Sequence, residues 1–156
     1  MATGTGRPDD VEDALAASRA LLAVVASSLV ETLDQLTLPQ YRILVVLSEN
    51  GPLRSGDLAE RVGVHQSTIT RTADRLVDAG LITRQVGSES RREVIVDLTD
   101  TGKALVLDVM ARRRRELARI LQGAGVADRR AIVRGLRAFA RAAGEPEPGQ
   151  LLSLGL

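Results

Sequence analysis

The 156-residue sequence predicts a mainly α-helical protein with one small β-hairpin. Three observations support this class. Long stretches near both chain ends carry apolar residues at the three-to-four spacing of a helix. A short helix, a glycine turn and a second helix are expected between residues 55 and 79. A strand, a polar turn and a second strand follow between residues 81 and 98.

The composition fits one globular domain. The chain is 44% hydrophobic and 26% charged, with a net charge of +1, which argues against global disorder. No apolar run approaches the roughly 18 residues expected of a membrane span, and the N-terminus lacks a secretion signal. We therefore expect a cytoplasmic protein with no membrane partner. The absence of cysteine excludes disulfides, thiolate metal sites and cysteine redox sensing.

Residues 11–36 are expected to form the first long helix. Leu15, Leu22, Leu29 and Leu36 recur every seven residues, and such an apolar stripe needs a partner helix. That partner can belong to the same chain or to a second copy, and the spacing does not distinguish them. The first 38 residues are acidic, with six carboxylates against two arginines.

The second helix is expected to begin after Thr37. Residues 37–40 (TLPQ) have the spacing of a capping box, with proline in the first turn. Tyr41, Leu44 and Leu47 share one face of this helix, which the Asn-Gly-Pro sequence at residues 50–52 ends.

The segment from residue 55 to residue 98 predicts a DNA-binding unit. Two helices joined by a short turn at Gly63 form the helix-turn-helix pattern, in which the second helix enters a major groove. Apolar spacing predicts that this second helix buries Ile69, Ala73, Leu76 and Val77. Its opposite face carries Ser67, Thr68, Thr70, Arg71 and Arg75.

Small hydroxyl residues let a helix approach the groove floor and can bond phosphates or base edges. Arg71 is the best placed residue for a two-bond contact with guanine. The alternative is an amphipathic surface helix whose hydroxyls serve only for capping, and the flanking turn and ribbon favour DNA. Asp74 and Asp78 are expected to orient nearby arginines rather than to face DNA.

His65 lies where the second helix begins, and either a phosphate contact or an exposed, unused ring fits its position. A single histidine without cysteine does not make a transition-metal site. Arg91 and Arg92 follow the turn of the ribbon, where an arginine can enter a minor groove; a solvated pair is the alternative.

The chain beyond the ribbon predicts two more helices. Residues 99–102 (TDTG) offer capping for a long helix, a break at residues 123–125 follows, and a further helix carries Ile132, Leu136 and Phe139. Four consecutive arginines, residues 112–115, point all around a helix axis and so make no flat DNA-binding patch. We expect them to be solvated or paired with the acidic first helix. The apolar tail at the C-terminus either docks across a dimer or is disordered.

Together these motifs resemble the MarR family of transcription regulators. The chain carries L-T-x-x-Q from residue 36, L-A-x-x-x-x-V from residue 58, S-x-x-T-x-x-x-x-x-L-x-x-x-G-L-I-x-R from residue 67 and V-x-L-T-x-x-G from residue 96. These motifs and the Arg-Arg pair of the ribbon cover roughly residues 36–105. The resemblance implies a winged helix-turn-helix core flanked by N- and C-terminal dimerisation helices.

It also implies a division of the chain. Residues 37–100 would form the DNA-binding domain, residues 11–36 and 101–143 the helical dimerisation region, and residues 1–10 and 144–156 the two tails. The implied partners are a second copy and a double-stranded, pseudo-palindromic operator, at which such proteins usually repress transcription. The candidate DNA-binding residues are then His65, Gln66, Ser67, Thr68, Thr70, Arg71, Arg75, Arg84, Arg91 and Arg92.

The sequence departs from the family in the turn of the β-hairpin, which is the wing of a winged helix. Gly87 and Ser90 replace the usual aspartates there, so the contact that the wing makes with DNA is not determined. Many members release DNA when a small, often aromatic acid binds between the two regions. Tyr41 and Phe139 are the only aromatic residues, so any effector is expected to occupy an aliphatic pocket with an arginine for its acid group.

Two other function classes fit the sequence less well. A winged helix that binds protein rather than DNA would more often expose apolar residues where this chain has hydroxyls and arginines. An enzyme is not supported, because the sequence has no nucleophile–base pair, no phosphate loop and one histidine. No cofactor is predicted.

Overall fold

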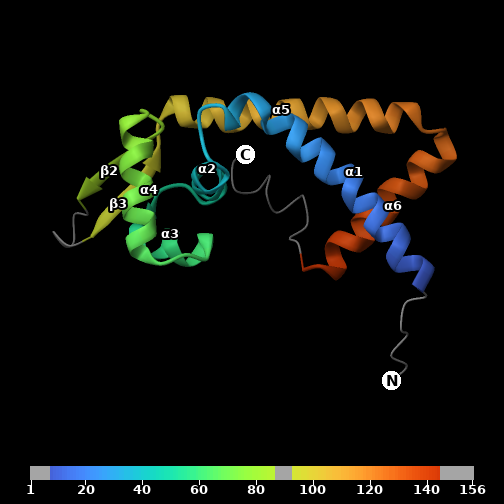
Figure 1. The fold of residues 1–156 in the computed structure, drawn as a ribbon, viewed down its shortest axis with the longest axis horizontal. Coiled ribbons are helices and arrows are strands. Elements are labelled where there is room, and N and C mark those ends of the chain that lie inside the picture. The colour runs from blue at the N-terminus through green and yellow to red at the C-terminus, as the bar shows by residue number, and fades with distance from the viewer. Residues whose placement is uncertain (1–7, 87–92, 145–156) are drawn as a thin grey trace, which may run out of the picture.

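The computed structural model describes residues 8–86 and 93–144, which form six helices and three short strands. In chain order they are α1 (Pro8–Leu33), α2 (Leu38–Asn50), β1 (Leu53–Arg54), α3 (Ser55–Val62), α4 (Gln66–Asp78), β2 (Ile82–Val86), β3 (Val94–Leu98), α5 (Asp100–Gly123) and α6 (Val126–Ala142). Figure 1 shows α3, α4 and the strands grouped at one end of the molecule. Helix α5 runs from this group to the opposite end, where α6 turns back below it. The mainly helical class with a small sheet is confirmed.

The sheet has three antiparallel strands in the order β1-β3-β2 rather than the two predicted. Strand β1 pairs Leu53 with Val96 and Arg54 with Ile95. A strand of two residues is too short to show alternation in the sequence, so only its pairing with β3 reveals it. It ties the start of α3 to the sheet.

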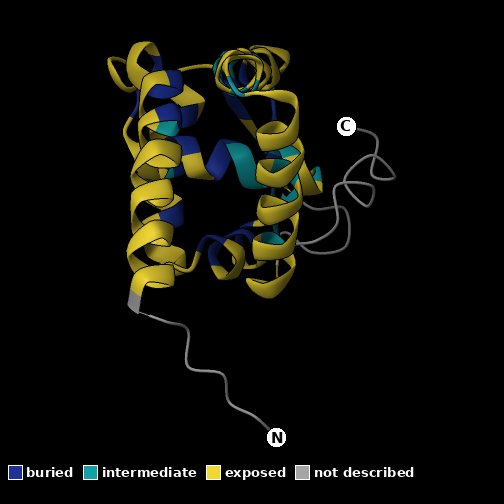
Figure 2. Cartoon of the chain, turned by 90° about the vertical axis from the view of Figure 1, so that its right-hand side faces the viewer, coloured by how far each residue is buried: buried dark blue, intermediate teal, exposed yellow. Residues whose placement is uncertain are grey.

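One hydrophobic core holds the helix-turn-helix together. Leu44, Leu58, Ile69, Leu76 and Val96 are all 0% exposed. The same cluster includes residues of α1 and of the first turns of α5, so these helices are anchored on the core. Helix α6 contributes no buried residue. Figure 2 shows the contrast between the buried centre and the largely exposed helices α1 and α6.

Helix α1 divides into an anchored half and an exposed half. Leu29 and Leu36 are buried within the chain, whereas Leu15 and Leu22 are 47% and 66% exposed. The helix ends at Leu33, three residues before the predicted end, and the backbone N–H of Leu36 closes the following turn on Thr32 O at 2.9 Å. The seven-residue stripe therefore serves an intrachain contact only at its C-terminal end.

Both predicted helix starts use the expected caps. Gln40 Oε1 accepts a hydrogen bond from the backbone N–H of Thr37 at 2.8 Å, which is the glutamine half of a capping box. Thr99 Oγ1 accepts from the N–H of Gly102 at 3.0 Å and donates to Gly80 O at 2.7 Å. Thr99 therefore caps α5 and binds the turn that follows α4.

The expectation about membrane spans needs a correction. The helical segment Asp9–Leu33 is long and apolar enough to cross a membrane by length and composition alone, among the residues described. Alanine, valine and leucine dominate it, although serines and a few charges interrupt every continuous apolar run. A helix with apolar side chains on more than one face, such as a helix that packs against two partners, passes the same test.

Candidate nucleic-acid interface

The turn between α3 and α4 depends on a left-handed glycine. Gly63 has φ of 77°, and its N–H donates to Ala59 O at 2.9 Å, which ends α3. His65 is the extended N-cap residue of α4, and its side chain makes no capping hydrogen bond. The ring is exposed at the N-terminal end of α4, as the sequence predicts.

The buried face of α4 is narrower than predicted. Ile69, Ala73 and Leu76 are 0% exposed, but Val77 is 38% exposed. Assigning Val77 to the core was wrong, because Val77 lies about 100° around the helix axis from Leu76, at the edge of the apolar stripe. Three residues thus hold α4 against the domain, and the rest of its circumference faces outward.

The outward face of α4 carries the predicted contact residues. Gln66, Ser67, Thr68, Thr70, Arg71 and Arg75 are all exposed. Within the described part of the chain, neither Arg71 nor Arg75 forms an ion pair, so both guanidinium groups are available to an external acceptor. No acidic residue lies in the first turn of the helix. The N-terminal half of α4 is therefore open, uncharged or basic, and rich in hydrogen-bonding groups.

The hydroxyl groups of this face are not equivalent. Thr70 Oγ1 donates to Gln66 O at 3.1 Å, so its hydroxyl already has a partner in the helix backbone. Ser67 and Thr68 make no side-chain hydrogen bond to any described residue. Ser67 and Thr68 are therefore better placed than Thr70 to donate a hydrogen bond to phosphate. The sequence alone does not distinguish these three hydroxyl groups.

Arg84 of β2 is already engaged within the protein. Its guanidinium forms an ion pair with Asp74 of α4, and its Nη2 lies 3.5 Å from Thr70 O. The Arg84 side chain is 24% exposed. The prediction that Asp74 orients an arginine is confirmed, whereas Asp78 forms no ion pair among the described residues. Arg84 thus links the sheet to the recognition helix.

A hollow of about 540 Å³ lies between α4, the start of α3 and the sheet. Gln66 and Thr70 line it from α4, and Arg84 lines it from β2. Arg54, which no sequence motif identifies, also lines it, with its Nε 3.6 Å from Glu93 Oε1. Its place at the helix–sheet junction becomes visible only once β1 is known. Arg91, Arg92, Gly87 and Ser90 lie outside the described residues, as does the C-terminal tail from residue 145.

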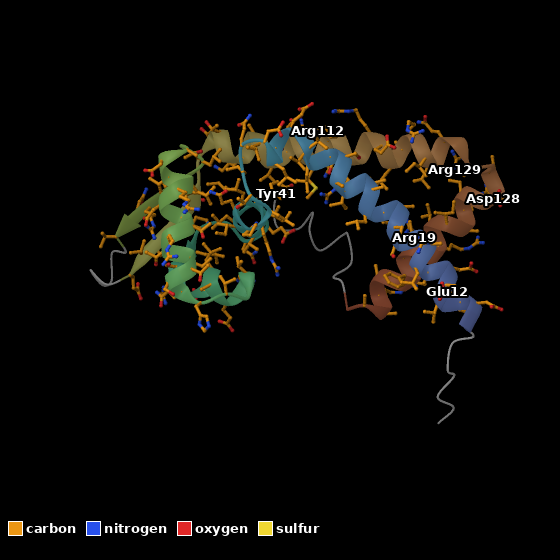
Figure 3. The ribbon with its side chains drawn as sticks, in the orientation of Figure 1. Glu12, Arg19, Tyr41, Arg112, Asp128 and Arg129 are labelled. Carbon is orange, nitrogen blue, oxygen red and sulfur yellow. The ribbon has the colours of Figure 1, made fainter. Side chains whose placement is uncertain are left out.

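The arginine run of α5 contacts the first helix, as expected. Arg112 donates to Ser28 O at 3.1 Å and to Thr32 Oγ1 at 3.1 Å, and it forms ion pairs with Glu31 and with Asp108. Figure 3 shows Arg112 where α1 and α5 meet. This arginine ties α1 to α5 and is not part of the DNA-facing surface.

Tyr41 lies near this arginine cluster. Its ring is buried, and its hydroxyl has no hydrogen-bond partner among the described residues. Burial raises the pKa of Tyr41, although the positive charges of Arg113 and Arg112 oppose the shift. The phenol therefore stays protonated at neutral pH and can donate a hydrogen bond.

Comparisons with known proteins agree with this geometry. The profile of the MarR family matches residues 36–94. The chain is 31% identical to the transcriptional regulator YfiV of Bacillus subtilis, over 69% of this chain and 67% of that protein. It is 32% identical to the transcriptional repressor MdtR of the same organism, over 66% and 68% of the two chains.

Solved structures give the same result. The crystal structure of RV1404 from Mycobacterium tuberculosis is similar with a TM-score of 0.83 and 42% identity, covering 93% of this chain and all of that one. NadR, solved in complex with 4-hydroxyphenylacetate, is similar with a TM-score of 0.57 and 26% identity, covering 88% and 96%. The helix-turn-helix with its open, basic recognition face and these similarities lead to one conclusion: the chain belongs to the MarR family and is a DNA-binding transcription regulator rather than an enzyme.

Proposed function

We propose that this protein is a cytoplasmic, homodimeric repressor that binds a pseudo-palindromic operator. The two copies of α4 enter major grooves, and the two hairpins contact the adjacent minor grooves. The observation that carries the proposal is the exposed face of α4, where Arg71 and Arg75 form no ion pair with a described residue and lie beside the hydroxyl groups of Ser67 and Thr68. Arginine reads guanine through two hydrogen bonds, and hydroxyl groups bond phosphates.

Exposed apolar side chains support the dimer. Leu15 and Leu22 of α1 are 47% and 66% exposed, and Leu136 and Phe139 of α6 are 40% and 66% exposed. These residues lie on the exposed half of α1 and on α6, which contributes no buried residue. Large apolar side chains left exposed in this number on two helices indicate an interaction site. A second copy that covers both helices would bury these side chains.

The proposal is tested by titrating the protein against duplex DNA that carries its binding site, at several salt concentrations. We expect two chains per duplex and an affinity that falls steeply with salt, because bound arginines displace counterions from phosphate. The competing function, a winged helix that binds another protein, predicts weak binding with no sequence preference. The polar, basic face of α4 favours DNA binding over protein binding.

We infer that Arg84 acts on DNA binding through Asp74 rather than by direct contact. Removing either partner releases the same link between β2 and α4, so Asp74→Ala and Arg84→Ala should weaken operator binding to a similar extent. The double variant should be no worse than the single ones, because the second change removes nothing further. The measurement is a double-mutant cycle on operator affinity at two salt concentrations.

A direct contact between Arg84 and phosphate would give a different result. Arg84→Ala would then weaken binding far more than Asp74→Ala, and it would lower the slope of log affinity against log salt by about one. Asp78→Ala is the matched control, since Asp78 is exposed on the same helix but forms no ion pair with a described residue.

We further propose that a small organic acid regulates DNA binding from a hollow between α1 and α5. This hollow of about 310 Å³ is lined by Ser27, Ser28, Arg112, Arg115, Glu116 and Arg119. Its lining is polar, unlike the aliphatic pocket expected from the sequence. Arg119 is held by two hydrogen bonds to Glu116, which lower the pKa of that carboxyl. Arg115 has no ion pair among the described residues and is available to a carboxylate. NadR, one of the similar structures, was solved in complex with such an acid, 4-hydroxyphenylacetate.

Benzoate and hexanoate are suitable probes, since one is flat and aromatic and the other aliphatic. We expect at least one of them to raise the melting temperature of the protein and to release it from operator DNA. Arg115→Ala should abolish the effect of the acid while leaving DNA binding intact. Release that persists in Arg115→Ala would place the acid elsewhere.

A further inference from the structure

The hollow between α4 and the sheet contains two arginines that differ in how far they are engaged. Arg54 of β1 and Arg84 of β2 both line this hollow, together with Gln66 and Thr70 of α4. The Arg84 side chain is 24% exposed and pairs with Asp74 of α4. The Arg54 side chain is 53% exposed. Arg54 is therefore the more accessible cation of the hollow.

The sheet holds the backbone of Arg54 in place. Arg54 pairs with Ile95 of β3, and the preceding residue Leu53 pairs with Val96. Leu53 packs against the hydrophobic core. Because successive side chains of a strand point to opposite faces, the side chain of Arg54 leaves the strand on the face away from the core.

A carboxylate lies beside the guanidinium of Arg54. Its Nε is 3.6 Å from Glu93 Oε1, and the Glu93 side chain is 31% exposed. Hydrogen bonds between nitrogen and oxygen are roughly 2.7–3.2 Å long, so this contact is an ion pair without a hydrogen bond. Such pairs are weak when water reaches them. An anion that accepts hydrogen bonds from the guanidinium can therefore replace Glu93.

Double-stranded DNA brings an anion of this kind to the hollow. In the proposed complex, α4 lies in a major groove and the hairpin of β2 and β3 contacts the adjacent minor groove. One sugar-phosphate backbone separates these two grooves, so it crosses the gap between α4 and the hairpin. The hollow lies in this gap. Figure 1 shows α4, β2 and β3 grouped at the same end of the molecule.

We propose that Arg54 binds a phosphate of this backbone segment, and that Glu93 holds the guanidinium when DNA is absent. On binding, the guanidinium exchanges the carboxylate for phosphate oxygens, to which it can donate two hydrogen bonds. The inference rests on the proposed function and adds a cation outside α4 to its contact residues. A phosphate contact positions the protein on the duplex without reading the base sequence.

A DNA phosphate fits the hollow better than a small free anion does. The carboxylates of Asp57 and Glu93 line the hollow with the two arginines, so a free anion meets as many negative as positive side chains there. A phosphate of bound DNA is brought to Arg54 by the contacts of α4 with the same duplex, which raise its effective concentration.

The first test neutralises Arg54 and Glu93 separately and together. Arg54→Gln should lower the affinity for every duplex by about tenfold for each bound chain. It should also lower the slope of log affinity against log salt by about one for each chain, and Arg54→Lys should restore that slope. Fluorescence anisotropy at several salt concentrations measures both effects.

Glu93→Gln should have the opposite effect. It should raise DNA affinity by about two- to fivefold, the strength of an exposed ion pair, because the guanidinium no longer has to leave a carboxylate. The gain should be much smaller when Arg54→Gln is also present, since Glu93 then has no guanidinium to hold. Arg114→Gln is the matched control, because Arg114 is an exposed arginine on α5 outside the recognition surface.

The second test locates the phosphate. Single phosphates on either side of each half-site are replaced by uncharged methylphosphonates, one duplex at a time. The parent protein should lose about tenfold in affinity at a phosphate between the major groove and the flanking minor groove. Arg54→Gln should lose nothing further at that phosphate, because the contact is already absent.

Several results would overturn the proposal. Unchanged affinity and salt slope in Arg54→Gln would show that Arg54 does not touch DNA. Weaker binding in both Arg54→Gln and Glu93→Gln would make the pair a brace between β1 and β3, and additive effects in the double variant would show that Glu93 does not act through Arg54. If Arg54→Gln fails to fold in urea unfolding, Glu93→Gln still has to raise the affinity. A parent protein that binds no duplex would instead contradict the proposed function itself.

Discussion

Replacing Arg71 with alanine should weaken operator binding by about 1–3 kcal/mol per half-site and relax the sequence preference at one base pair. The reason is geometric. Arg71 is exposed on the outward face of α4, and no described residue competes for its guanidinium. Fluorescence anisotropy with the preferred duplex, and with the same duplex changed one base pair at a time, measures both effects.

The dimer and the fold should be unaffected by this change, because Arg71 contributes nothing to the core or to α1 and α6. Arg114→Ala is the matched control, since Arg114 is an exposed arginine on α5 outside the recognition surface. If Arg71→Ala binds the preferred site as tightly as the parent protein, Arg71 is not the residue that reads the operator.

Replacing Gly102 with alanine should destabilise the protein by about 1–3 kcal/mol, the usual cost of forcing a methyl group into a packed site. A Cβ at this position would lie 2.1 Å from Leu81 O and 3.1 Å from Leu98 Cδ2. The Leu81 carbonyl cannot move aside easily, since it accepts a hydrogen bond from the N–H of Thr99 at 3.1 Å. Urea unfolding at fixed protein concentration measures the loss.

Gly135→Ala gives the matched control. Gly135 lies within α6 with no atom within 4 Å of its Cβ position, so alanine there should stabilise the helix by about 0.5–1 kcal/mol. Equal stability of Gly102→Ala and the parent would mean that α5 does not pack on the Leu81 turn as described. Since this joint connects the DNA-binding unit to α5, Gly102→Ala should also reduce operator affinity.

Local signals explain why much of the fold was predictable. The threonine caps at residues 37 and 99, the left-handed Gly63 and the buried spacing of α4 each act within a few residues, so the sequence displays them directly. The motifs of the second helix likewise predicted which polar residues of α4 face outward.

What the sequence could not supply depends on contacts between distant residues. Strand β1 forms because Leu53 pairs with Val96 of β3. Arg84 forms an ion pair with Asp74 because β2 places it beside α4. The spacing of Val77 from Ile69 and Ala73 fits the apolar face of a helix, so the sequence predicts that it is buried. The width of the buried face of α4 depends instead on the elements that pack against this helix.

The most direct test of the central claim is selection of bound sequences from random duplex DNA by the full-length protein. A two-fold DNA reader predicts a preferred site with two inverted half-sites whose centres lie about one helical turn, roughly 10 bp, apart. Recovery of no preferred sequence, or of a single half-site without its inverted partner, would contradict the account of α4 as the reading helix of a symmetric dimer.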